Sequence, residues 1–221
     1  GFGGGRIKIA YDEWNMRNWH HPWHGDLRRG FDHEARRKND IASTYTMADA
    51  LFSACFLNAC LRHSDVVDIA CHAPIVNTRG PLFVHPEGLV RRTTFYVFKM
   101  YTNWLEDYMI PVSLTSERLV QGNLSTAVLD VVLTGNAEKT RYVCAVVNKS
   151  PEQRCALTLD FEGMGVKTPR RIEGMVLSGS SPDDYNDVDV ERVVPEKRVF
   201  EVKHGQVVLP PHSLTLLTIV R

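Results

Sequence analysis

The pattern of secondary-structure signals changes at Ile110-Pro111, and this change limits the possible folds more than any other feature. Before it, strand and helix signals alternate: strands over 6–12 and 66–73, helices over 46–65 and 93–108. This β-α-β-α order predicts parallel strands in an α/β sheet or barrel.

The helix predicted over 46–65 carries its own start signal. Thr46 can act as the N-cap, and Asp49 stands at the third helical position, as in a short version of the capping box. The segment is apolar almost all round, so we expect other elements to pack on most of its sides.

The chain after residue 110 has a different character, because short strand-like runs follow one another between turn residues such as Gly135-Asn136 and Gly205. The runs cover 127–135, 141–150, 154–163, 171–179, 197–205, 206–211 and 213–221. This spacing is typical of an antiparallel, jelly-roll-like β-sandwich. We therefore predict two domains, an α/β portion over 1–110 and a β-sandwich over 111–221.

The α/β portion is too small to form a sheet domain by itself. A parallel strand is buried on both faces and needs neighbours, and a complete (β/α)8 barrel takes about 250 residues. We expect either that the chain is the C-terminal piece of a larger protein or that another chain completes its sheet, and we favour the first.

Composition excludes several classes of protein. Twenty-six basic and 26 acidic residues give a formal net charge of zero, which argues against a non-specific nucleic-acid binder. We predict no membrane span, because no apolar run approaches about 20 residues, and no signal peptide is visible in the opening GFGGG. Five cysteines without CxxC spacing disfavour a zinc knuckle and favour reduced thiols in the cytoplasm, although secretion stays open.

The candidate site lies where the two predicted strands end. Asp12 and Glu13 end the first strand, and His72 ends the second, followed by Asn77 and Arg79. Active sites of parallel α/β folds lie at these carboxyl ends, so the side chains should meet at one rim and suit a polyhydroxylated substrate. Three tryptophans would add aromatic faces for a sugar ring: Trp14, Trp19 and Trp23.

The first strand is predicted to be buried, so its terminal acids should lose hydration and need a partner or a use. A retaining glycosidase needs two carboxyl groups about 5–5.5 Å apart. Asp12 and Glu13 cannot form that pair, since successive strand residues point to opposite sides. The second acid must come from another strand. Glu87 is the best candidate within the chain, although a turn position is the commoner role for such an acid.

Other interpretations of these residues stay open. An acid at a strand end is often simply ion-paired, and Asp12 is expected to be structural. His72 is equally a site-lining group or a satisfied buried histidine, and Asn77 and Arg79 either contact substrate or brace their loop. The H-H-x-x-H pattern over 20–24 is read as a loop instead of a metal site, because Pro22 interrupts any helix.

The sequence resembles the C-terminal part of α-L-arabinofuranosidases of glycoside hydrolase family 51. The resemblance rests on D-E-W-N at 12–15, N-T-R-G at 77–80, H-P-E-G at 85–88 and the last strand, L-P-P-H-S-L-T-L-L-T-I-V-R. It extends over essentially the whole chain. The strand-end motifs carry it, since the sandwich strands alone are not specific.

This resemblance implies a (β/α)8 barrel with a β-sandwich, in which the strands over 6–12 and 66–72 are barrel strands seven and eight. It implies Glu13 as the nucleophile, with the acid/base Glu on a strand before residue 1. The expected substrate-binding residues are Trp14, Asn15, Trp19, His72 and Asn77. Many relatives have an aromatic residue at the position of Arg17 and some a Gln near Pro74, so the exact substrate is not determined.

We therefore expect the C-terminal portion of a retaining enzyme that removes terminal α-L-arabinofuranosyl groups from arabinan- or arabinoxylan-type saccharides, inactive as a fragment. The expected partners are the saccharide, the upstream barrel segment and possible further copies of the chain, with no cofactor or metal. One alternative is a non-catalytic carbohydrate-binding or assembly module, which would retain sugar affinity in an isolated 110–221 segment. Another is a related endo-acting glycosidase.

Overall fold

The structure, a computed structural model, describes residues 7–16, 45–77, 79–161, 165–188 and 190–221. The first part of the chain contains β1 (Ile9–Trp14), α2 (Met47–Arg62), β2 (Val67–His72), β3 (Leu82–His85), β4 (Gly88–Arg91) and α3 (Thr93–Trp104). The second part contains β5 (Tyr108–Ile110), β6 (Arg118–Gln121), β7 (Leu124–Ala127), β8 (Leu129–Gly135), β9 (Arg141–Asn148), β10 (Cys155–Thr158), β11 (Arg171–Ser178), β12 (Glu196–Glu201), β13 (Gln206–Leu209) and β14 (Ser213–Val220).

A six-stranded antiparallel sheet forms the centre of the molecule, in the order β12-β11-β14-β9-β8-β5. Its inner strand β9 has the sequence RYVCAVVN and is buried from its second residue to its last. A strand with one solvated face would alternate between apolar and polar residues. The nearly continuous apolar run in β9 indicates instead that both faces are covered.

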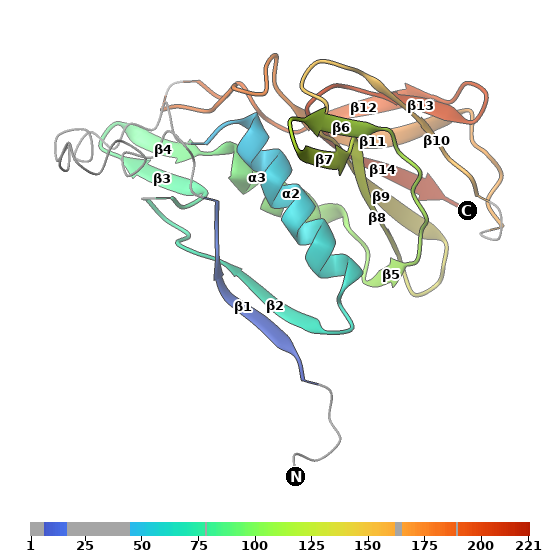
Figure 1. Ribbon diagram of the computed structural model, residues 1–221, viewed down its shortest axis with the longest axis horizontal. Helices are drawn as coiled ribbons and strands as arrows, with labels where there is room; N and C mark the ends of the chain where they lie inside the picture. The colour runs from blue at the N-terminus through green and yellow to red at the C-terminus, as the bar shows by residue number, and fades with distance from the viewer. Residues whose placement is uncertain (1–6, 17–44, 78, 162–164, 189) are drawn as a thin grey trace, which may run out of the picture.

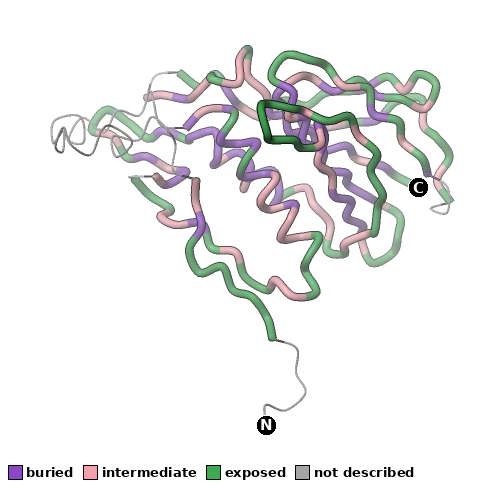
Figure 2. The backbone as a smooth tube through the Cα atoms, viewed as in Figure 1, coloured by how far each residue is buried: buried purple, intermediate pink, exposed green. Residues whose placement is uncertain are grey.

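Alternate residues of the sheet belong to two different cores. Val143, Ala145 and Val147 face α2 and α3, whereas Cys144 and Val146 face the second, two-stranded sheet of β10 and β13. The arrangement is therefore helices, central sheet and outer strands in three layers (Figure 1). We call the two facing sheets the sandwich. Burial is concentrated in the helices and the central sheet (Figure 2).

Both predicted helices form, but the second is shorter than expected. The capping box is confirmed, since the Thr46 N–H donates to Asp49 Oδ2 at 2.7 Å. The helix predicted over 93–108 ends at Trp104, because Leu105 takes an extended conformation. The last residue of the predicted helix, Tyr108, instead begins β5, which pairs with β8 of the central sheet.

The strand that carries the acids is parallel to β2, as predicted, but its predicted burial is wrong for the described residues. Ile9 is 42% exposed, Tyr11 40% and Ile69, on β2, 51%. Within the described part of the chain, β2 is the sole strand paired with β1, and nothing covers the face turned away from the helices. These residues therefore contain one parallel pair and no closed barrel.

A hairpin that the sequence analysis did not predict follows β2. β3 and β4 pair antiparallel, with Phe83 opposite Val90 on the buried side and Val84 opposite Leu89 on the exposed side. Glu87 lies in the connecting turn, as the commoner interpretation predicted. The H-P-E-G segment is therefore the tip of a hairpin.

Candidate active site

The acidic pair at the end of β1 lies in a β-bulge. Tyr11 is paired with Ala70 and Trp14 with His72, so three steps along β1 match two along β2. The extra residue falls at Asp12-Glu13. Bulges bend a strand, redirect its side chains and are frequent next to active sites.

The bulge explains how side chains three positions apart reach the same neighbour. The rings of Tyr11 and Trp14 lie 5.4 Å and 4.2 Å from that of Phe56 on α2. In a regular strand, residues three apart would point to opposite faces. Asp12 and Glu13 lie between the two aromatic anchors and are exposed. The predicted loss of hydration is thus not seen in the described residues, because nothing described covers that face.

Trp14 and His72 belong to an aromatic cluster on the helix side of the strands. The His72 ring lies edge-on to Trp14 at 5.0 Å and to Phe98 of α3 at 5.1 Å. The Trp14 carbonyl accepts a hydrogen bond from the Ala73 N–H at 3.1 Å. The structure therefore places both rings where they hold the ends of β1 and β2 together. Their contact with substrate stays a prediction.

His72 is buried, yet only one of its ring nitrogens has a partner in the described part of the chain. Nδ1 donates to the Pro74 carbonyl at 3.2 Å, whereas His72 Nε2 and Trp14 Nε1 are buried without one. Burial lowers the pKa of His72, so the ring is neutral near pH 7.

Asn15 and Asn77 hold the loop that follows β2. Asn15 Nδ2 donates to the carbonyls of Ala73 at 3.2 Å and Arg79 at 2.8 Å. Asn77 has a φ of 56° and accepts the Val84 N–H on its side-chain oxygen at 2.7 Å. Asn77 thus makes the bracing contact that sequence reasoning left open. A role for either residue in substrate binding stays a prediction.

A buried arginine that sequence reasoning missed supports the same loop. The Arg92 guanidinium lies 4.9 Å from the ring centre of Tyr45 and 5.2 Å from that of Phe83, and Nη1 donates to the Gly80 carbonyl at 2.9 Å. Burial lowers the pKa of Arg92 to about 10, so the side chain stays charged near neutral pH. In the sequence, nothing distinguishes it from its exposed neighbour Arg91.

Several predicted residues lie outside the described residues. They are Arg17, Trp19, Trp23 and the three histidines His20, His21 and His24.

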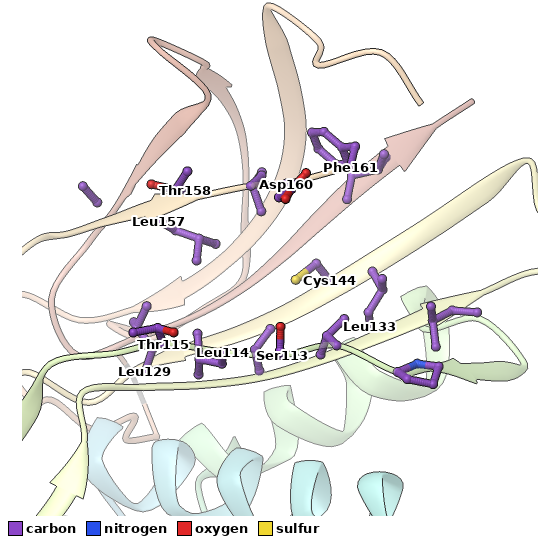
Figure 3. Close-up of a pocket in the computed structure, with 17 residues that line it drawn as sticks. Ser113, Leu114, Thr115, Leu129, Leu133, Cys144, Leu157, Thr158, Asp160 and Phe161 are labelled. Atoms are coloured by element: carbon purple, nitrogen blue, oxygen red, sulfur yellow. The ribbon is translucent and has the colours of Figure 1, made fainter. Parts of the chain in front are cut away.

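A cavity of about 600 Å³ lies in the sandwich, on other elements than the bulge. Figure 3 shows Cys144 and Leu133 of the central sheet facing Leu157 and Phe161. Asp160 is the one acid among the described residues that line it. The described lining of the cavity therefore lacks the pair of carboxyl groups that glycoside hydrolysis requires.

The fold resembles that of glycoside hydrolases. A family 51 alpha-L-arabinofuranosidase from Bifidobacterium longum matches with a TM-score of 0.78 and 22% identity, over 99% of this chain and 44% of that one. An alpha-L-arabinofuranosidase from Thermotoga maritima, solved as an arabinose complex, matches with a TM-score of 0.75 and 20% identity, over 97% and 43%.

The family model described as "Alpha-L-arabinofuranosidase C-terminal domain" matches residues 12–213, so the chain belongs to this family. A relative named "Intracellular exo-alpha-(1->5)-L-arabinofuranosidase" from Streptomyces lividans is 29% identical over 86% of this chain and 28% of its own length. Another, named "Probable alpha-L-arabinofuranosidase C", from Aspergillus niger, is 29% identical over 96% of this chain and 39% of its own. The chain thus spans about two fifths or less of these curated relatives.

Two further predictions from the sequence concern the cysteines and membrane spans. All five cysteines are free thiols, as predicted. Neither α2 nor α3, the helices of the described residues, has the length and apolar character that a membrane crossing requires.

Proposed function

We propose that the complete protein containing this chain is a retaining alpha-L-arabinofuranosidase with Glu13 as its nucleophile. It removes terminal arabinofuranosyl groups from arabinan- or arabinoxylan-type saccharides. The observation that carries this proposal is the bulge at Asp12-Glu13, which presents two exposed acids at the carboxyl end of a parallel strand in a chain of this family.

In this mechanism the Glu13 carboxylate attacks the anomeric carbon, and the bond to the leaving oxygen breaks. A second carboxylic acid, from a part of the protein outside these residues, protonates that oxygen and then activates the water that hydrolyses the glycosyl-enzyme. Trp14 directly follows the nucleophile, and its ring stacks on Phe56 of α2, which anchors this end of β1.

The same proposal assigns β1 and β2 to strands seven and eight of a (β/α)8 barrel, with the other strands supplied by the rest of the protein. The exposed apolar side chains of Ile9 and Ile69 support it, because they gain stability when further elements cover them. We place the barrel portion in 1–110 and the sandwich in 111–221. Asn15, Trp19, His72 and Asn77 are assigned to the substrate rim.

The relative described as intracellular, together with the five free thiols, supports a cytoplasmic location.

The test is covalent labelling of the complete protein with an arabinofuranose-configured mechanism-based inactivator, followed by peptide mapping. We expect one label, on Glu13, that free arabinose delays and that Glu13→Gln abolishes. Glu173→Gln, which changes an exposed acid on β11 of the sandwich, is the matched control and should label normally.

A label on Glu87 or another carboxylate would retain the enzyme and overturn the site. Sugar binding without label or hydrolysis would favour the binding-module alternative. Cleavage confined to internal linkages of a glucan or xylan would favour the endo-acting alternative.

A further inference from the structure

The connection between β11 and β12 leaves the sandwich and lies against the elements around the candidate site. We call residues 179–188 and 190–195 the bracing segment. Its carbonyls cap the start of α2, since Asp184 O accepts the Met47 N–H at 2.7 Å and Pro182 O accepts the Ala48 N–H at 2.9 Å. These N–H groups have no partner within a helix, so the sandwich completes the N-terminus of α2.

Asn186 is the most buried polar residue of the bracing segment, with 1% of its surface exposed. Its Nδ2 donates to the carbonyls of Arg91 and Val193, both at 2.9 Å, and its oxygen accepts the Val193 N–H at 2.8 Å. Every hydrogen-bonding group of the side-chain amide is thus used. The bond to Arg91 joins the bracing segment to β4.

Two more contacts fix the segment to the same region. Val188 packs against the buried pair of Phe83 and Val90 on the β3–β4 hairpin. Glu191 accepts the Tyr96 hydroxyl of α3 at 2.7 Å and lies 3.4 Å from Arg91 Nη1. The hairpin is therefore held from its backbone, its apolar face and its neighbouring helix.

Hydrogen bonds to the loop between β2 and β3 connect the hairpin to the bulge. Arg92 follows the Arg91 carbonyl that Asn186 binds, and its guanidinium reaches the Gly80 carbonyl. The loop between β2 and β3 also contains the Arg79 carbonyl, which accepts a hydrogen bond from Asn15, two residues after Glu13. The backbone is closely packed at this point, since a Cβ on Gly80 would lie 2.5 Å from the Ile75 backbone.

From these contacts we propose that Asn186 is a positioning residue through which the sandwich sets the shape of the substrate rim. This inference rests on the proposed function of Glu13 and adds a specificity role for the sandwich. Asn186 contacts the hairpin and not the bulge, so its loss should change how a saccharide is held more than how the bond is broken. Uniform binding contributes to KM, whereas interactions made only in the transition state contribute to kcat.

The chain offers a matched control in Asn148, which is 0% exposed and also uses its whole side-chain amide. Its Nδ2 donates to the carbonyls of Gln153 at 3.0 Å and Pro210 at 2.7 Å, and its oxygen accepts the Ser150 N–H at 3.1 Å. All three bonds stay within the sandwich. Asn148→Ala and Asn186→Ala therefore remove equal numbers of hydrogen bonds, and only the second loosens the rim.

The experiment compares both variants in the complete protein, with an arabino-oligosaccharide as substrate. We expect Asn186→Ala to raise KM about tenfold with kcat within about threefold of wild type, and Asn148→Ala to leave KM unchanged. Equal KM values for the two variants, or a loss confined to kcat, would overturn the inference. Should Asn186→Ala fail to fold, Val188→Ala replaces it, with a smaller KM increase expected and an unchanged KM again overturning the inference.

The design separates the two proposals. A wild-type protein that does not hydrolyse arabinofuranosides would refute the proposed function before any variant is compared. An active wild type whose Asn186→Ala and Asn148→Ala variants have equal KM values would refute the positioning role alone.

Discussion

The strands β1 and β9 are both rich in apolar residues, yet they have opposite environments. β9 is buried on both faces, between the helices and the outer strands. In β1 five of six residues are exposed, and only Trp14 is buried. The difference arises from neighbours, since β9 pairs with β8 and β14 whereas β1 has one described partner, β2.

Together with the proposed function, this contrast predicts that stability and chemistry depend on different parts of the chain. The buried strands use their side chains to remove apolar area from water, the main favourable contribution to folding. The exposed strand keeps two acids accessible at a bulge, with a single aromatic anchor on each side. Changes on β1 should therefore alter activity, and changes in the central sheet should alter stability.

The largest effect is expected at the bulge. Glu13→Gln in the complete protein should lower kcat for an arabinofuranoside by several orders of magnitude, because the amide cannot form the glycosyl-enzyme. The urea midpoint of unfolding should stay unchanged, since Glu13 is exposed. Near-wild-type turnover would place the nucleophile elsewhere and would contradict the expectation that changes on β1 alter activity.

The next effect is expected in the central sheet. Leu216 on β14 is 1% exposed and lies opposite Ala145 and Met175, so Leu216→Ala should leave a cavity and cost about 2–5 kcal/mol. Val120→Ala, at a position 70% exposed, is the control and should change stability by less than about 0.5 kcal/mol. Urea denaturation measures both, and similar losses would contradict the assigned core.

A smaller loss is expected where the helices join the sheet. Asn58 is 0% exposed, donates to Asp130 on β8 at 2.7 Å and accepts the Tyr101 hydroxyl at 2.6 Å. Asn58→Ala should destabilise the protein by about 1–3 kcal/mol, because the partners lose a bond in a buried site. Asn103→Ala on the exposed side of α3 provides the comparison and should be nearly neutral in the same denaturation assay.

The smallest effect is a pH dependence at the strand ends. Burial lowers the pKa of His72 from its ordinary value of about 6.5, so on acidification the unfolded chain binds a proton before the folded chain does. The contribution of His72 to the free energy of unfolding is therefore present above about pH 6.5 and is lost as the pH falls through the lowered pKa. The free energy of unfolding, measured at about pH 7.5 and about pH 5.5, should fall less in His72→Phe than in wild type. An equal decrease in both would show that other groups cause the acid sensitivity.

Much of the element content could be predicted from local pattern. The start of α2, the parallel pairing of β1 with β2 and most strands of the central sheet follow from capping residues, periodicity and connection length. The hairpin of β3 and β4 was missed, although its residues alternate around Pro86-Glu87. The helix predicted over 93–108 includes Tyr108, the first residue of β5, because Tyr108 continues the aromatic pattern of α3. Only the pairing with β8 places it in a strand.

The candidate site was only partly predictable. Sequence placed Asp12, Glu13 and His72 at neighbouring strand ends, since parallel strands end on the same edge. It did not reveal the bulge, which depends on the register between two strands, or the direction of the Trp14 ring. It also gave no sign of Arg92 or Asn186, whose importance comes from distant carbonyls that only folding brings within reach.

The sequence by itself determined the identity of the helices and most strands and the resemblance to arabinofuranosidases, because these depend on residues close together in the chain. Only the tertiary structure decided which strands are covered, where β1 gains its extra residue and how the bracing segment contacts the β3–β4 hairpin. Burial and register depend on contacts between segments far apart, such as Asn186 and Arg91. Local periodicity carries no information about those partners.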